Sequence, residues 1–243
     1  MAEYKAIRGH TIRTVAGDPD PLAVGDIWYS TVTKKIRGAA IGAGSWSTGG
    51  ALNSGRRGLA GCGAASTSAL AFGGELPAAT DISEEYNGTS WTEGDDLNHA
   101  RIRLGGCGTQ TAGLASASET APGIETEIYD GSSWTEEGDL NGARGYVMTF
   151  GTSTAAVTAG GTPPALALVE EWNGTSWTEV TNIPAVKYGA GTAGILTNGL
   201  IFAGQPAPHV STIQYDGTSW TAGGNVSTGR LATVGFGETQ DTA

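Results

Sequence analysis

Paired acidic residues are the first feature of the sequence that could carry chemistry. They occur as Glu84-Glu85, as Glu125 with Glu127, and as Glu170-Glu171. Two carboxylates that flank a sugar linkage are the usual machinery of glycoside hydrolysis. The three pairs, however, recur at one register of an internal repeat, whereas a catalytic centre needs a single asymmetric set of groups. We therefore expect solvated charges on a strand face, paired in part with nearby arginines, and we expect no catalytic residues and no enzyme.

Two cysteines, Cys62 and Cys107, and three histidines complete the set of candidate ligands. The cysteines lie 45 residues apart, which is one step of the repeat. They could form a thiol pair or a metal site, but we favour two small buried hydrophobic side chains. The histidines are far apart in sequence, and no phosphate-binding loop or Ser-His-Asp arrangement stands out. The sequence therefore predicts no metal site and no cofactor.

A basic side chain recurs ten residues after each of five tryptophans. The tryptophans are Trp46, Trp91, Trp134, Trp177 and Trp220, at spacings of 45, 43, 43 and 43, and the basic residues are Arg56, Arg101, Arg144, Lys187 and Arg230. These side chains could line an anion-binding mouth, or each could bond to the backbone and acids around it. Regular recurrence at so many positions identifies a five-fold repeat.

Each repeat unit contains four short strand signals separated by turns. In the third complete unit they cover residues 144–150, 155–161, 167–172 and 175–179. The last two are joined at Asn173-Gly174, a pair typical of the two-residue type I′ hairpin turn, in which both residues have positive φ. Four antiparallel strands in a unit of roughly 43 residues predict the blades of a β-propeller.

This pattern resembles the kelch repeat over residues 26–243. The resemblance depends on the repeated Arg, on an aromatic residue before the hairpin turn, on the outer Trp and on a Gly-Gly pair after the second strand. Gly-Gly is present at 73–74 and 160–161, and we align Ser118-Glu119 and Ala203-Gly204 with it in the other two complete units. The resemblance implies that the repeated Arg is structural, so we prefer that role to anion binding.

The two ends of the chain are expected to share a blade. D-I-W-Y-S (26–30), K-K-I-R-G-A-A-I (34–41) and G-S-W-S-T (44–48) fit the second to fourth strands of a unit, and L-A-T-V-G-F-G (231–237) fits a first strand. The expected fold is therefore an all-β, five-bladed kelch-like propeller over residues 26–243. Its ring would be closed by three N-terminal strands and one C-terminal strand, with residues 1–25 as an arm outside it.

The amino-acid sequence of the repeats, such as N-G-T-S-W-T, is similar to that of kelch-type proteins of tailed bacteriophages. That resemblance implies a non-enzymatic virion protein, used for host attachment as a tail-fibre or receptor-binding component. A capsid or neck decoration protein is the alternative, and a carbohydrate-active enzyme on a five-bladed propeller is the alternative of another class. The partners would be other virion proteins, contacted by the arm, and a host-surface glycan or protein.

Charge and loop composition limit the remaining choices. The net charge of −11 argues against nucleic-acid binding, and no apolar run is long enough to cross a membrane. No secretory signal is visible at the N-terminus, so we expect a virion protein made in the host cytoplasm. The loops between the second and third strands differ most between units, and are equally well explained as partner contacts or as plain connections. Their candidate contact residues are Glu75, Asp81, Glu119, Glu125, Pro163, Pro164 and His209.

Overall fold

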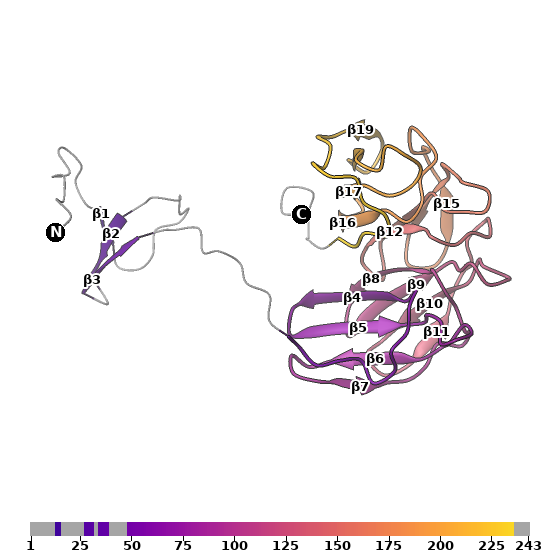
Figure 1. The fold of residues 1–243 in the computed structure, drawn as a ribbon, viewed down its shortest axis with the longest axis horizontal. Coiled ribbons are helices and arrows are strands. Elements are labelled where there is room, and N and C mark those ends of the chain that lie inside the picture. The colour runs from indigo at the N-terminus through magenta and orange to yellow at the C-terminus, as the bar shows by residue number, and fades with distance from the viewer. Residues whose placement is uncertain (1–12, 16–26, 32–33, 39–47, 236–243) are drawn as a thin grey trace. The chain divides into compact units, whose positions relative to one another are not determined.

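The chain divides into two units, residues 1–48 and residues 49–243 (Figure 1). The computed structural model describes residues 13–15, 27–31, 34–38 and 48–235. Every regular element within these ranges is a β-strand, and no helix there is long and apolar enough to span a membrane. The protein is all-β, as the short strand signals predict.

The first unit contains a three-stranded sheet in the order β1 (Arg13–Val15), β2 (Ile27–Ser30) and β3 (Lys35–Gly38). Strand β1 runs parallel to β2, and β2 pairs antiparallel with β3, with Ile27 opposite Gly38. The expected pairing of residues 26–30 with residues 34–41 is therefore found where both segments are described, between residues 27–30 and 35–38.

The second unit consists of four antiparallel sheets of four strands, each running in chain order from the inner to the outer strand. The strands are β4 (Ala60–Ala65), β5 (Ser68–Phe72), β6 (Ser83–Tyr86) and β7 (Trp91–Glu93) in the first sheet; β8 (Gly105–Thr109), β9 (Ala112–Ser116), β10 (Thr126–Tyr129) and β11 (Trp134–Glu136) in the second; β12 (Met148–Gly151), β13 (Ala156–Ala159), β14 (Val169–Trp172) and β15 (Trp177–Glu179) in the third; and β16 (Gly191–Ile195), β17 (Asn198–Phe202), β18 (Thr212–Tyr215) and β19 (Trp220–Ala222) in the fourth. The inner strands β4, β8, β12 and β16 pack in succession, so the sheets are the blades of a β-propeller.

The expectation of five blades with one shared between the termini is wrong: the described residues form four blades. Two features of the first unit explain the difference. Only four residues separate β2 from β3, whereas residues 73–82 separate the second and third strands of the first blade. In addition, β1 joins β2 in parallel. At the other end, residues 231–235 form no strand. Residues 39–47 and 236–243, and the expected boundary at residue 25, lie outside the described residues.

The repeated hairpin between the third and fourth strands has a different turn from the type I′ turn expected. Gly88, Gly131, Gly174 and Gly217 have φ between 91° and 95°, but the residues before them do not have positive φ. Instead, the side-chain oxygen of each Asn or Asp accepts backbone hydrogen bonds two and three residues on, as Asp130 Oδ1 does from Ser132 and Ser133 at 2.8 and 2.9 Å. The motif is a four-residue turn held by a side chain.

The alignment of the Gly-Gly pair with Ser118-Glu119 is wrong by one residue. The left-handed conformation of Gly160, with φ of 61°, is adopted by Ala117 at 62° and by Ala203 at 63°. Both alanines are buried, so the tertiary structure holds a side chain in a conformation that glycine adopts more readily.

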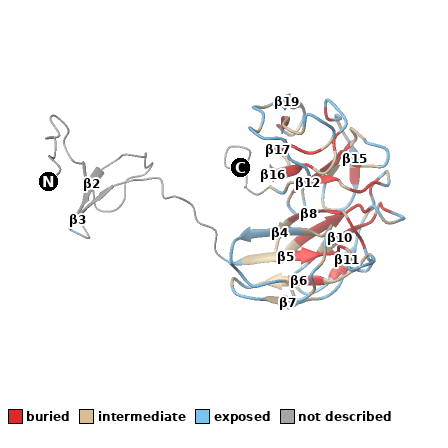
Figure 2. Ribbon diagram, in the orientation of Figure 1, coloured by how far each residue is buried: buried red, intermediate tan, exposed pale blue. Residues whose placement is uncertain are grey.

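The hydrophobic core lies between successive blades in three clusters. Trp134 packs with Leu70 and Phe72 of the first blade, and Trp177 packs with Cys107 and Leu114 of the second. Their indole N–H groups donate to hydroxyls of the preceding blade, Trp177 Nε1 to Thr126 Oγ1 at 2.8 Å. Figure 2 shows that the inner strand β4 is largely exposed, whereas β12 is largely buried. Trp134 and Trp177 therefore each lock their own blade to the one before it.

A second lock between blades is a tyrosine hydroxyl that donates to a carboxylate of the preceding blade. Tyr129 donates to Glu85, and Tyr215 donates to Glu171 at 2.6 Å. Between the second and third blades both partners are absent, because the corresponding residues are Ile128 and Trp172. The tyrosine and the glutamate are thus both replaced at this junction.

Alkaline pH is expected to weaken the tyrosine locks. Burial, the hydrogen bond to the carboxylate and its negative charge raise the pKa of Tyr129 and Tyr215 above the ordinary value of about 10. Because the unfolded chain then loses these protons first, stability falls as the pH rises above about 10. In melting experiments from about pH 9 to about pH 12, the wild type should lose more stability than Tyr129→Phe/Tyr215→Phe. Equal losses would contradict the assignment.

Candidate functional site

The repeated arginines of the first three blades are buried and paired with the acids of the third strand. Arg101 Nη2 lies 2.7 Å from Glu127 Oε1, and Arg144 Nη1 lies 2.7 Å from Glu170 Oε1; Arg56 pairs with Glu84 in the same way. These guanidinium and carboxylate groups are at most 1% exposed. The expectation that these three acids are solvated is therefore wrong, but their pairing with the arginines is observed.

An asparagine completes each of these networks. Asn98 donates its backbone N–H and its side-chain amide to Glu127 Oε2 at 2.7 and 2.9 Å, and Asn141 does the same to Glu170. The carboxylate thus accepts on both oxygens, which compensates for its burial. In blade order, the networks comprise Asn53, Arg56 and Glu84; Asn98, Arg101 and Glu127; and Asn141, Arg144 and Glu170.

The fourth blade replaces all three members of the network together. Pro184 and Ile213 stand where the other blades have Asn and Glu, and Lys187 stands at the Arg position. The Lys187 ammonium donates instead to Ala203 O at 2.7 Å and to Ser211 Oγ at 2.8 Å. Neutral oxygens thus hold the Lys187 ammonium in place of a carboxylate. Burial lowers the pKa of Lys187.

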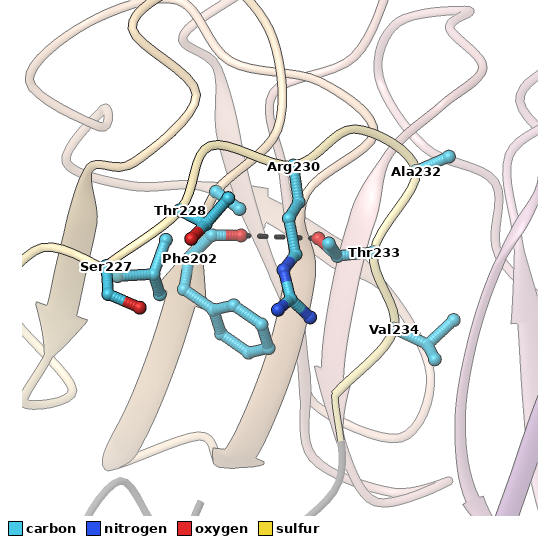
Figure 3. A pocket seen from close by; sticks show the side chains of 9 residues that line it. Phe202, Ser227, Thr228, Arg230, Ala232, Thr233 and Val234 are labelled. Atoms are coloured by element: carbon cyan, nitrogen blue, oxygen red, sulfur yellow. Dashed lines mark hydrogen bonds between the residues drawn. The ribbon is translucent and has the colours of Figure 1, made fainter.

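Arg230 has the same register but different surroundings. It is exposed and lines a hollow of about 570 Å³ with Phe202, Val226, Thr228 and Thr233 (Figure 3). Figure 3 also shows the bond from Thr233 Oγ1 to Phe202 O, at 3.5 Å. The five basic residues therefore do not form one ring: four are in blade interiors, and Arg230 is at the edge of the last blade.

The two cysteines are free thiols on the neighbouring inner strands β4 and β8. Burial raises the pKa of Cys62 to about 12 and raises that of Cys107 as well. Among the described residues no group of three or more His, Cys, Asp or Glu side chains could hold a metal.

The cysteines are expected to react slowly with alkylating reagents. Only the thiolate is nucleophilic, and a raised pKa leaves little of it near neutral pH. Iodoacetamide at about pH 8 should modify Cys62 and Cys107 at least about 100-fold more slowly than a small exposed thiol. Mass spectrometry of a time course measures both rates, and rates near that of the exposed thiol would show the burial to be wrong.

A chain of charged and aromatic side chains crosses all four blades on one side of the propeller. We call it the belt; it consists of Arg57, Glu75, Arg103, Glu119, Tyr146 and Tyr188. Arg103 is at its centre: it pairs with Glu119, lies 3.7 Å from Glu75 and stacks 4.8 Å from the ring centre of Tyr146. Arg57 reaches Glu75 at 2.7 Å, and the rings of Tyr146 and Tyr188 are 6.2 Å apart.

The backbone beneath the belt explains why these side chains meet. The residue two positions before each inner strand is left-handed, with φ of 65° at Gly58, 54° at Arg103, 53° at Tyr146 and 58° at Gly189. Each of the last three donates its N–H to the carbonyl of the equivalent residue in the preceding blade, at 2.7 to 2.9 Å. The four positions therefore form a hydrogen-bonded line across the blades. Left-handed φ is costly for Arg and Tyr, and such strain is concentrated at functional sites.

The predicted contact residues of the loops divide into three groups. Glu75 and Glu119 belong to the belt. Asp81 and Glu125 do not: the Asp81 carbonyl accepts from Leu97, and Glu125 is buried with its carbonyl accepting from Arg101. Pro163 and Pro164 are exposed, and His209 Nδ1 lies 2.9 Å from Gly204 O within its own loop.

Arg57, Arg103, Tyr146 and Tyr188 are the belt residues that the repeat pattern did not single out. The signal that could have found Arg103 and Tyr146 is their divergence at a shared register, where the other units have Gly58, Gly189 and Ala232. A charged or aromatic residue at a position otherwise held by glycine or alanine stands out once the units are aligned.

The fold and this surface define a β-propeller with a non-repeating polar belt on a repeating scaffold. No protein-family model matches the sequence, and no curated protein matches it. The class of the protein is therefore given by its architecture.

Proposed function

We propose that this protein is a non-enzymatic component of a tailed-phage particle, and that its propeller binds a host-surface glycan or protein. The observation that carries the binding role is the belt, because its ionic and aromatic side chains break the repeat while the scaffold around them keeps it. The proposal that the particle is a phage is supported by the similarity between the repeat sequence and the sequences of kelch-type phage proteins.

The chemistry of the belt suits recognition of a polar ligand. Tyrosine and arginine are the side chains most enriched where proteins bind partners, since they combine large contact area with directional hydrogen bonds. Arg57 is 80% exposed, and Arg103 and Glu119 are about 30% exposed, so all three can reach a ligand. The acids that recur, such as Glu127 and Glu170, already bond to Arg and Asn inside the blades, which favours binding over acid–base chemistry for the exposed face.

The location within the particle has two candidates, a tail fibre or receptor-binding component and a capsid or neck decoration protein. The same propeller serves either location. The N-terminal unit is the proposed attachment to other virion proteins, since it is a separate unit and carries the basic residues Lys34, Lys35 and Arg37.

Two measurements test this proposal. Mass spectrometry of purified particles should detect the protein, and its absence from particles would refute the virion role. Labelled full-length protein should adsorb to host cells, and Arg57→Ala/Tyr188→Ala should reduce adsorption at least about tenfold without changing the melting temperature. Glu136→Gln on the outer strand β11 is the matched control. Equal adsorption of the belt variant and the control would exclude the belt as the contact surface.

A further inference from the structure

The last described segment, residues 230–235, follows the path of an inner strand without belonging to a sheet. Gly204 N donates to Arg230 O at 3.1 Å, as Gly74 N does to Arg101 O and Gly161 N to Lys187 O. Arg230 N donates to His209 O, as Arg101 N does to Thr80 O. The chain therefore leaves the fourth blade as it leaves the others, towards the first strand of a blade.

This segment lies against the fourth blade, and no described residue of the propeller pairs with its other side. Gly235 is so close to Thr192 O that a Cβ there would lie 2.2 Å from it, and Thr233 contacts Phe202. By contrast, Leu231 is 51% exposed and Val234 is 87% exposed. In every described blade the matching segment pairs with a second strand, as β8 does with β9. Residues 231–235 thus have the position of an inner strand, and among the described strands none pairs with them.

Arg230 indicates the chemistry of a strand that could pair with residues 231–235. Three of the four other repeated cations pair with a carboxylate from the third strand of the blade that they open, and the fourth, Lys187, is held by Ala203 O and Ser211 Oγ. Arg230 opens onto the hollow beside Phe202, where its guanidinium is available to a carboxylate (Figure 3). It is also a cation on a body with a strong excess of acids, so it provides the local attraction that an acidic segment needs.

We propose that residues 230–235 and the hollow beside them form a docking edge that accepts a β-strand from a separate polypeptide, with an Asp or Glu of that strand bound to Arg230. Strand addition satisfies unpaired backbone groups, and side chains next to the edge select the partner. Here the selection is by charge at Arg230 and by apolar contact at Phe202, Leu231 and Val234. The interaction is distinct from the belt and independent of what the belt binds.

A peptide copied from the chain itself is the probe. Residues 112–129 cover the second and third strands of the second blade: β9 pairs with the inner strand β8, and β10 carries Glu127, the carboxylate that meets Arg101. A fluorescent peptide of this sequence should bind the full-length protein saturably in an anisotropy titration. Arg230→Ala in the protein, or Glu127→Gln in the peptide, should each weaken binding at least about tenfold, and the two together should cost little more than either alone. Lys34→Ala in the first unit is the control and should leave binding unchanged.

Hydrogen exchange separates this proposal from other occupants of the edge. Amides of residues 231–235 should exchange rapidly in the free protein at all concentrations, and the peptide should slow them. Slow exchange in the free, dilute protein would mean that the chain covers its own edge, and slowing with rising protein concentration would mean that a second copy does. Either result would overturn the proposal, as would peptide binding that Arg230→Ala leaves unchanged.

Discussion

Replacement of Arg101 by alanine is expected to lower the free energy of unfolding by about 3–5 kcal/mol. The Arg101 side chain donates to Glu127 Oε1 at 2.7 Å and to Glu125 O at 2.9 Å, and the residue is fully buried. Removing it leaves the Glu127 carboxylate buried with only Asn98 as a partner. An uncompensated buried charge is among the most destabilising defects that one substitution can create.

Urea unfolding followed by tryptophan fluorescence measures this loss. Arg57→Ala is the matched control, since its side chain is 80% exposed and an exposed ion pair contributes at most about 1 kcal/mol. Arg101→Ala/Glu127→Ala should be less destabilised than the sum of the two single variants, because the second substitution removes the charge that the first leaves unpaired. If Arg101→Ala were no worse than Arg57→Ala, the buried network would not be a stabilising element.

Replacement of Trp177 by alanine is expected to cost a similar amount, about 3–5 kcal/mol. Its ring is 6% exposed and packs against the second blade, so truncation opens a cavity between two blades. Trp177→Phe should cost less, because it keeps most of the packing and loses the indole bond to Thr126 Oγ1. Calorimetry of the three proteins measures the series.

Trp91 is the control for this series. It occupies the same register in the first blade but is only half-buried, and its indole N–H donates to Gly50 O at 3.1 Å. Trp91→Ala should therefore cost less than half as much as Trp177→Ala. Equal losses would mean that the outer tryptophans stabilise their own blades, instead of the junction with the preceding blade.

The repeat register predicts the blade architecture because a blade is built from local patterns. The Trp spacing locates the fourth strand, the turn residues locate the hairpin before it, and the strand signals follow within the unit. The buried networks could be predicted only in part. The recurrence of Arg and Glu in the units indicates that they pair, but it does not indicate the burial that makes the pairs stabilising. Asn98 and its counterparts recur seven residues after a repeated Trp in three units, but that recurrence does not indicate a bond to a buried carboxylate.

The number of blades could not be read in the same way. A repeat count shows how many tryptophans recur, whereas a blade also needs four strands that pair in space. Residues 26–30 and 34–41 have the strand pattern, and β2 does pair with β3. However, only four residues separate these two strands, and β1 joins β2 in parallel, so this sheet differs from a propeller blade. Pairing direction and turn length arise from tertiary contacts that alternation of side chains does not encode.

The sequence by itself determined that the protein is all-β, that it is built from repeated four-stranded units and that one repeated Trp stands on the outer strand of each blade, because these properties depend on short-range periodicity and turn chemistry. Only the tertiary structure decided that four blades form, that Arg101 and Glu127 are buried, and that Arg57, Arg103 and Tyr146 meet in the belt. Arg101 and Glu127 lie 26 residues apart and meet inside one blade. The belt residues lie on different blades, and they come together only because successive blades pack side by side.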